Sequence, residues 1–383
     1  MPLIVLVAAT FGLAAMVAFL ATPVAARIAR RAGAIDQPGA ARRVHRRPIP
    51  RAGGLAVAAG FLVVGPAAVA LNAATGAVPS IGAIGAPELV ALFAGSALAA
   101  ALGFIDDRFD LRARWQLLVQ LALAGVAVAA GVTIDFINNP LGQGRLDFVG
   151  PTAVLLTVIW IVGMINSINF IDGLDGLSSG VALIAVVTLG LISWFTLGQA
   201  FVALLCAVLA GALAGFLPWN FHPARIFVGT TGVYLIGFAL AVLSILGTAK
   251  VAVALLVLGV PIIDTFWIIV RRLLQRRSPF TPDRGHLHHR LLDLGLGHRD
   301  AVVVIYALCV VLAVLSFGLS GTGQLYAFLG LVLGGGLLLY LLTRRAREAL
   351  EASSYDDDVP NGAAEGPPDD TARGEASAHR AGV

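Results

Sequence analysis

Apolar residues run almost without interruption along most of the chain, and short polar clusters separate them. Apolar segments of about 17 residues or more are long enough to cross a bilayer as helices. The pattern therefore predicts an all-α, multi-pass membrane protein. We place eleven transmembrane helices at 2–24, 53–72, 88–104, 115–134, 151–167, 177–197, 199–216, 229–247, 250–270, 301–319 and 325–343.

Two of these predictions depend on local detail. Only Gly198 and its neighbours separate 177–197 from 199–216, so these two helices are the least distinct pair. The first apolar run ends at Thr22-Pro23 without a convincing cleavage pattern. We therefore expect the first run to stay in the protein as a membrane span and not to be removed as a signal peptide.

Composition supports a membrane protein, because 58% of the residues are hydrophobic and 13% are charged. Soluble domains have about 25% charged residues. Cys206 and Cys309 lie inside apolar runs, which favours small buried side chains over a disulfide or a metal site. Residues 351–383 are instead acidic and rich in Pro, Gly, Ala and Ser, which predicts a disordered tail after a membrane domain spanning 1–350.

The basic residues indicate the orientation. With eleven spans, 24 of the 26 Lys and Arg residues fall on one side of the membrane, and only Arg145 and Lys250 fall on the other. Basic loops stay in the cytoplasm. The N-terminus is therefore expected outside and the C-terminus inside, in a bacterial inner membrane.

Every polar cluster of note falls on this cytoplasmic side. We therefore expect a site that faces the cytoplasm at the depth of the membrane surface. The clusters are "RRVHRRPIPRAGG" (42–54), "FIDDRFD" (104–110), "NSINFIDGLD" (166–175), "PWNFHPARIFVG" (218–229) and "DRGHLHHRL" (283–291).

Four acids in these clusters, Asp106, Asp107, Asp172 and Asp175, indicate a divalent cation. Carboxylates near hydrocarbon need a compensating charge, and oxygen ligands suit Mg²⁺ or Mn²⁺. The alternative is that the acids only solvate helix ends. Asn166, Asn169, Asp172 and Asp175 follow one another at intervals of three residues, so all four can share one broad helix face. Gly173 and Gly176 are then expected to end the helix.

Basic residues beside these acids suggest an anionic partner. His45 and Arg46, with nearby arginines, could hold phosphates, although arginines in cytoplasmic loops also serve only to fix topology. The cluster with Arg284 contains three histidines, His286, His288 and His289. It lacks a cysteine or a second histidine pair at zinc-site spacing, so phosphate contact is favoured over zinc.

Together the motifs "GFIDDRFDL", "NSINFIDGLDGLSSG", "NFHPARIFVG" and "DRGHLHHRLLDLG" resemble the bacterial polyprenyl-phosphate N-acetylhexosamine-1-phosphate transferases of glycosyltransferase family 4. This superfamily also contains the phospho-N-acetylmuramoyl-pentapeptide transferase. The resemblance covers about residues 40–300 and implies a Mg²⁺-dependent reaction. In it a UDP-sugar gives its sugar-1-phosphate to a membrane-held polyprenyl phosphate and UMP leaves. The form of the histidine motif is similar to the hexosamine branch.

The resemblance also implies roles for the site residues. Asp106 and Asp107 match the active-site acid pair, whose second member is proposed to activate the lipid phosphate. The polar residues of 166–175 match a set that lines the nucleotide and metal region, and the histidines match a motif that contacts the donor. The implied substrate-binding residues are Asn166, Asn169, Asp172, Asp175, His286, His288, His289, Arg284, His45 and Arg46, and the implied metal ligands are Asp107, Asp172 and Asp175.

One position departs from the family pattern. Thr230 in "FVGTTGVYLIG" stands where the family has a metal-binding acid, and Val233 stands where serine is usual. A hydroxyl is a poorer Mg²⁺ ligand than a carboxylate. Other acids could hold the metal, with Asp264 one candidate although the family also has an acid there. The metal stoichiometry could instead differ, or this chain could have lost catalysis and kept binding.

The leading prediction is transfer of N-acetylhexosamine-1-phosphate, with GlcNAc-1-phosphate the first choice, to start a lipid-linked cell-envelope glycan such as lipopolysaccharide or teichoic acid. The alternatives are a phospho-MurNAc-pentapeptide transferase and a catalytically impaired homologue that binds lipid or nucleotide. A transporter is disfavoured because the acids crowd one face. The expected partners are a UDP-sugar, polyprenyl phosphate and membrane lipid, with no nucleic acid, and a homodimer is left open.

Overall fold

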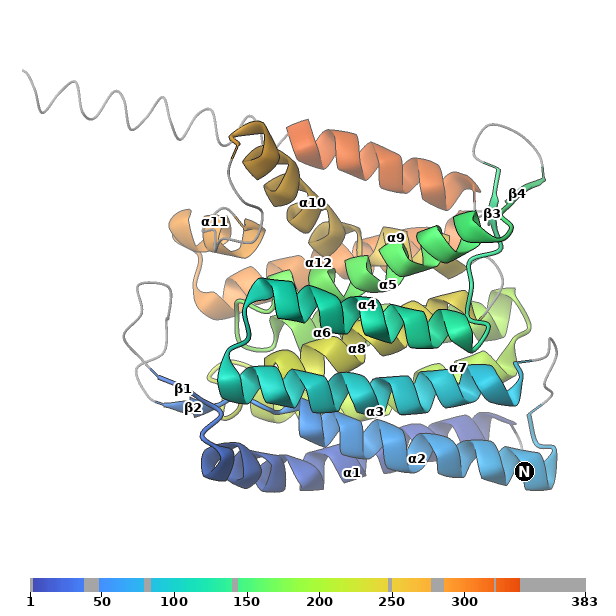
Figure 1. Cartoon of the computed structure of the whole chain (residues 1–383), viewed down its shortest axis with the longest axis horizontal. Helices are drawn as coiled ribbons and strands as arrows, with labels where there is room; N and C mark the ends of the chain where they lie inside the picture. The colour runs from blue at the N-terminus through green and yellow to red at the C-terminus, as the bar shows by residue number, and fades with distance from the viewer. Residues whose placement is uncertain are drawn as a thin grey trace, which may run out of the picture. The chain divides into compact units, whose positions relative to one another are not determined.

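The apolar segments fold into helices that run back and forth between two ends of a bundle (Figure 1). The computed structural model describes residues 3–37, 48–78, 84–139, 144–246, 250–276, 286–319 and 322–337. Residues 1–334 form one unit, and the arrangement given below belongs to it. Its helices are α1 (Leu3–Ala32), α2 (Gly54–Thr75), α3 (Ala86–Phe109), α4 (Ala113–Ala129), α5 (Pro151–Ile171), α6 (Leu177–Leu191), η1 (Ile192–Thr196), α7 (Ala200–Asn220), α8 (Gly229–Ile245), α9 (Lys250–Val257), α10 (Gly259–Leu274), α11 (Leu287–Asp293) and α12 (His298–Gly318), followed by a helix at Thr322–Leu337.

By length and composition, seven helices within the described ranges can cross a membrane, and an eighth span results if α9 and α10 are counted together. Three further apolar helices, α4, α8 and Thr322–Leu337, are shorter. Within the described residues, each predicted span therefore overlaps a helix or a helix pair, which confirms a multi-pass all-α protein. The full count of eleven crossings stays a prediction.

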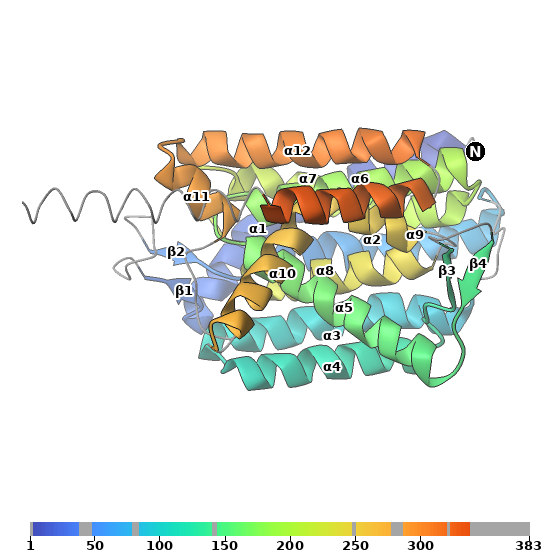
Figure 2. The same ribbon diagram turned by 90° about the horizontal axis from the view of Figure 1, so that it is seen from above.

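The segment predicted at 250–270 is not one straight helix. Its two halves, α9 and α10, meet at an angle of 77°. Pro261 follows the break closely, and a proline cannot donate a backbone hydrogen bond to the preceding turn. After the bend, α10 packs against α5, which it crosses in the view from above (Figure 2), and it also contacts α9 and α12.

Helix α8 forms the centre of the bundle, and all but one of its residues are buried. It packs against α3 and α5, while α1 packs against α7 on another side. Small residues allow this close packing: a β-carbon on Gly211 or Gly215 of α7 would collide with the backbone of α1. Close approach at small residues is the usual way in which helices associate in membranes.

Short strands mark the two ends of the bundle (Figure 1). At one end β1 (Ile35–Asp36) pairs with β2 (Ile49–Pro50), and at the other β3 (Phe136–Asn138) pairs with β4 (Arg145–Asp147). Beyond β2, Arg51 forms a parallel bridge with Phe227, and the N–H groups of Gly53 and Gly54 donate to carbonyls of 227–228. These contacts tie α2 to the start of α8 at the end where the polar clusters gather.

Candidate active site

The turn between α5 and α6 carries the central polar motif. Asn166 and Asn169 lie in the last turns of α5, which ends at Ile171, and Asp172 and Asp175 follow in the turn. The prediction that all four share one helix face is therefore wrong for the two aspartates. Asp172 accepts a hydrogen bond of 2.6 Å from the Ser178 hydroxyl, so its side chain is held by the next helix and not by α5.

A polar cavity of about 440 Å³ opens beside this turn. It brings together residues from the α5–α6 turn, the start of α8, the loop after α7 and the strand end near β2. Three of the predicted residues from 166–175 line it, together with Thr230. The lining residues are Asp36, Arg51, Asn169, Asp172, Gly173, Leu174, Asp175, Asn220, His222, Phe227, Gly229, Thr230 and His298.

Asp107 lies behind this cavity, bound to the start of α8. Its carboxylate accepts hydrogen bonds from the Thr230 N–H at 2.8 Å, the Thr231 N–H at 2.9 Å and the Thr231 hydroxyl at 2.6 Å. The Arg51 guanidinium lies 3.7 Å away. A helix N-terminus has unpaired N–H groups and partial positive charge, so it stabilises an anion here.

Asp106 points in a different direction from its neighbour. Its carboxylate accepts hydrogen bonds from the Leu111 N–H at 3.0 Å and the Gln116 side chain at 2.9 Å. Asn166 donates to Gln120 at 2.6 Å, which joins α5 to α4. The adjacent acids therefore do not converge on one point: Asp107 stabilises α8, and Asp106 stabilises the turn into α4.

Burial shifts the protonation of Asp172. Desolvation raises the pKa of this carboxyl from 3.8 to about 7, although the hydrogen bond from Ser178 opposes the rise. The negative charges of Asp107 and Asp175 raise the pKa further, and the Arg51 charge lowers it. A cation in the cavity would therefore stabilise the ionised form of Asp172.

The histidine motif lies next to the same turn without lining the polar cavity. His286 shares a hydrogen bond of 2.8 Å with Asp264, whose other oxygen accepts the Leu287 N–H at the start of α11. His288 is buried against Gly173, where a β-carbon would collide with its ring. Burial lowers the pKa of His288, with the neighbouring His289 and other histidines adding to the effect.

Asp264 therefore binds the start of α11 and does not line the cavity beside Thr230, so it does not replace the missing acid there. His289 lies against His288, with ring centroids 4.4 Å apart. Three other predicted residues, His45, Arg46 and Arg284, lie outside the described residues.

Sequence reasoning did not single out several residues of the cavity. His222 and Asn220 belong to the quoted cluster 218–229, but their types alone did not mark them as site residues. Asn220 is buried and accepts a hydrogen bond of 2.6 Å from Ser179. His298 had no local signal, because a lone histidine at the start of a helix has no distinctive spacing.

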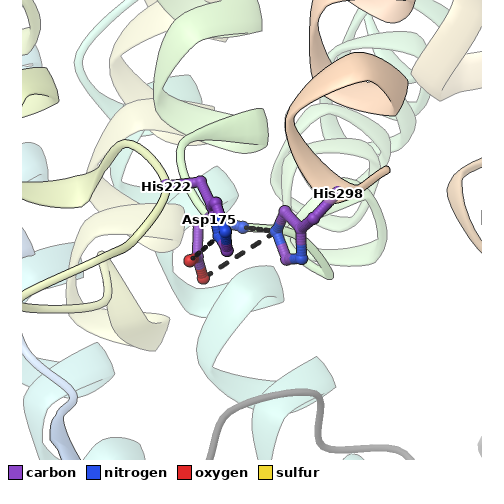
Figure 3. Close-up of side chains that lie close together, drawn as sticks. All are labelled: Asp175, His222 and His298. Carbon is purple, nitrogen blue, oxygen red and sulfur yellow. Dashed lines mark hydrogen bonds and ion pairs between the residues drawn. The ribbon is translucent and has the colours of Figure 1, made fainter. Parts of the chain in front are cut away.

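His222 and His298 meet at Asp175 (Figure 3). Their ligand-capable atoms and a carboxylate oxygen of Asp175 all lie within 4.8 Å of one another. His222 is 2.8 Å from one carboxylate oxygen, and His298 is 4.0 Å from the other. The two imidazole rings are stacked with centroids 4.4 Å apart.

A second, larger space lies alongside the polar cavity. It is an apolar groove of about 970 Å³ between α4, α5 and the α9–α10 pair. Ile159, Trp160 and Phe266 are among its walls, and its polar members include Gln116, Gln120 and Asn166. Asn169 lines both the groove and the polar cavity, so the two spaces meet at the end of α5.

The lining of the polar cavity includes oxygen donors of the kind that Mg²⁺ prefers. Mg²⁺ usually takes one or two protein carboxylates and completes its shell with water and phosphate oxygens. Asp172, Asn169 and Thr230 all line the cavity, so one carboxylate and two neutral oxygens are among its lining groups. Asp107 does not line the cavity, because the start of α8 occupies its carboxylate.

Comparison with known proteins finds the model for glycosyl transferase family 4 matching residues 89–248. The chain is 35% identical over 291 residues to a Bacillus subtilis protein named probable undecaprenyl-phosphate N-acetylglucosaminyl 1-phosphate transferase, covering 74% of this chain and 77% of that protein. It is 34% identical over 334 residues to the decaprenyl-phosphate N-acetylglucosaminephosphotransferase of Mycolicibacterium smegmatis, covering 81% and 80%. It is 28% identical over 302 residues to the undecaprenyl-phosphate alpha-N-acetylglucosaminyl 1-phosphate transferase of Escherichia coli, covering 76% and 77%.

Proposed function

The chain belongs to glycosyl transferase family 4, and from this membership we propose that it transfers N-acetylglucosamine 1-phosphate from a UDP-sugar to a polyprenyl phosphate, with release of UMP. The relatives named for this reaction are similar over about three quarters of the chain or more. None of the relatives described above is named for a phospho-MurNAc-pentapeptide substrate. The hexosamine reaction is therefore favoured over that alternative.

The observation that carries the proposal is the junction of the polar cavity and the apolar groove at Asn169. A polyprenyl phosphate has a long hydrocarbon chain and a charged head. The groove suits the chain, because its exposed lining is mostly apolar. The cavity suits the phosphate, because Arg51 and side-chain amides line it. One substrate can thus occupy both spaces with its phosphate near Asp172.

The chemistry asks mainly for charge neutralisation and alignment. A phosphate monoester has a second pKa near 6, so the lipid phosphate is mostly a dianion at neutral pH and needs little activation by a base. Its approach to a diphosphate brings two anions together. We propose that Asp172 binds Mg²⁺, with Mn²⁺ as a substitute, and that this ion neutralises charge on the diphosphate when bound.

The residues of the chain have separate tasks in this scheme. Arg51 offers a positive charge at the wall of the cavity. Asp107 fixes the start of α8, and with it Thr230, through the hydrogen bonds described above. Asn169 lies where the lipid phosphate would leave the groove. We therefore assign Asp107 a positioning role, although the family resemblance proposes it as the activating acid.

We propose that the cavity faces the cytoplasm. The last turns of α1 and α10 both carry arginine pairs, at residues 30–31 and 271–272, and both helices end at the end of the bundle that carries β1 and β2 (Figure 1). At the opposite end, the strands carry Arg145 paired with Asp147 at 2.8 Å. This distribution favours eleven crossings, an outer N-terminus and a cytoplasmic tail in a bacterial inner membrane.

Purified protein tests the function directly. UDP-GlcNAc and polyprenyl phosphate should yield UMP and lipid-linked GlcNAc-1-phosphate, and chelation of Mg²⁺ should stop the reaction. Asp172→Asn should lower turnover at least a hundredfold, whereas Asp147→Asn, exposed at the other end of the bundle, should leave it unchanged. Tight binding of either substrate without release of UMP would favour a binding protein that has lost catalysis.

A further inference from the structure

We infer that Asp175, His222 and His298 form a second metal site in the wall of the polar cavity, selective for Zn²⁺ and other nitrogen-preferring divalent ions. Two imidazoles and one carboxylate are a donor set that zinc uses in catalytic sites, where a further coordination position stays open. Mg²⁺ prefers oxygen donors only. This inference goes beyond the proposed transfer reaction and does not depend on it.

The geometry of the three side chains fits such an ion (Figure 3). Ligand atoms around a tetrahedral ion with bonds of about 2.1 Å lie about 3.4 Å apart. His222 Nδ1 lies 2.8 Å from one carboxylate oxygen of Asp175, and His298 Nε2 lies 4.0 Å from the other. One ligand atom from each residue lies within 4.8 Å of the other two, so the three side chains would have to draw closer together around an ion.

Three separate segments hold the ligands in place. Asp175 lies in the α5–α6 turn, where the Tyr306 hydroxyl donates to the carbonyl of Gly176. The loop of His222 is fixed because the Ala224 N–H donates to Asp175 at 3.0 Å. His298 is the first residue of α12, and its Nε2 accepts the Asp175 N–H at 2.9 Å. That nitrogen therefore carries no proton, and its lone pair would turn from the Asp175 N–H to the ion on binding.

The placement also gives the ion access to a ligand from solution. All three side chains line the polar cavity, so the coordination positions not taken by protein face an open space. A phosphate oxygen or a water could occupy them. The simpler alternative is that the three residues only hydrogen-bond to one another and clip the loop to α12, with no ion involved.

Conservative variants distinguish metal ligation by the two histidines from a purely structural role in which they only hydrogen-bond to Asp175. Asparagine at 222 keeps a donor close to the position of the His222 Nδ1, and glutamine at 298 keeps an acceptor close to the His298 Nε2. His222→Asn and His298→Gln therefore preserve the hydrogen bonds to Asp175 but remove the imidazoles. His379→Ala, outside the described residues, controls for the loss of a histidine elsewhere.

The test uses full-length protein purified in detergent through a tag without histidines and stripped with a chelator. Co²⁺ is titrated while its visible absorption is recorded, and Zn²⁺ is then added as competitor. Wild type and His379→Ala should bind one Co²⁺ per chain with a nitrogen-ligand spectrum. His222→Asn and His298→Gln should bind at least about tenfold more weakly.

Thermal unfolding with and without Zn²⁺ provides a second measurement of metal binding, which can be interpreted even if a variant is less stable than the wild type. Zn²⁺ should raise the Tm of wild type, because an ion that binds only the folded state stabilises it, and should not raise that of the two variants. No Co²⁺ spectrum in wild type, or equal affinity in all four proteins, would overturn the inference. Transferase activity with Mg²⁺ alone is measured in parallel, so a failure of the metal site is distinguishable from a failure of the proposed reaction.

Discussion

The carboxylate of Asp107 on α3 accepts two hydrogen bonds from Thr231 on α8, one from its N–H and one from its hydroxyl. The Thr230 N–H supplies a third. An acid that looked at first like a reactive group is therefore largely occupied by a helix N-terminus. The position of Thr230 at the cavity wall depends on this contact between two distant parts of the chain.

Gly229→Ala tests the contact between α3 and α8. A β-carbon at Gly229 would come 2.5 Å from the Asp107 carboxylate, and the backbone there has a φ of +68°. We expect a loss of about 2–4 kcal/mol in stability, from left-handed strain of about 1–3 kcal/mol and the displaced carboxylate, together with a fall in turnover. Thermal unfolding and UMP release measure the two effects.

Gly76→Ala is the matched control for the strain alone. Gly76 also has a positive φ, of +59°, but its β-carbon would meet nothing within 4 Å. Gly76→Ala should lose only the about 1–3 kcal/mol of stability that comes from left-handed strain, and its turnover should not change. Equal losses in the two variants would mean that the contact with Asp107 contributes nothing.

Thr230→Asp restores a carboxylate at the position where the family pattern has one. Thr230 lines the same cavity as Asp172, so the new acid would add a second carboxylate to the proposed Mg²⁺ site. We expect the Mg²⁺ concentration for half-maximal turnover to fall about tenfold, which equals about 1.4 kcal/mol. Thr230→Asn has nearly the same shape without the charge and should show a much smaller change. An unchanged Mg²⁺ requirement in Thr230→Asp would place the ion away from residue 230.

Much of the fold follows from local sequence, because each apolar segment must form a helix to satisfy its backbone in a membrane. This reasoning located the helices even where Gly198 alone suggested the break between α6 and α7. It did not predict the 77° bend before α10, because the residues on both sides are equally apolar. Pro261, in the first turn of α10, was the sequence feature that could have indicated the bend.

The site could be predicted only as far as local spacing reaches. The motif 166–175 and the position of Thr230 were found in the sequence, and Asn169, Asp172, Asp175 and Thr230 do line the cavity. The partner of Asp107 lies 124 residues away and that of Asp175 lies 123 residues away. Such pairs depend on how helices pack, and one sequence has no local pattern that reports them.

The pH dependence of metal binding should report on Asp172. Its ordinary pKa of 3.8 is raised to about 7, so the carboxyl is protonated below pH 7 and must lose a proton before it binds an ion. We expect Mg²⁺ affinity to fall about tenfold for each pH unit below 7 and to be flat above it. Mg²⁺-dependent substrate binding, measured from pH 5.5 to 8.5, gives the profile.

In Ser178→Ala the pH below which Mg²⁺ affinity falls should be higher than in the wild type, because the Ser178 hydrogen bond lowers the pKa of Asp172. Ser179→Ala is a neighbouring control, since the Ser179 hydroxyl donates to Asn220 and not to Asp172. If Mg²⁺ affinity in Ser178→Ala falls at the same pH as in the wild type, a group other than Asp172 controls its pH dependence.

The apolar groove offers the sharpest test of where the lipid lies. Gly163 lines the groove, and a β-carbon there would meet nothing within 4 Å, so Gly163→Phe should fold and fill part of the space. Gly125→Phe is its match, because Gly125 is also helical with open space around it but does not line the groove. We expect Gly163→Phe to raise the KM for a long polyprenyl phosphate about tenfold, with no change for UDP-GlcNAc or for an acceptor with a short chain. Gly125→Phe should behave as wild type with every acceptor. If both variants impair long and short acceptors alike, the hydrocarbon chain lies outside this groove.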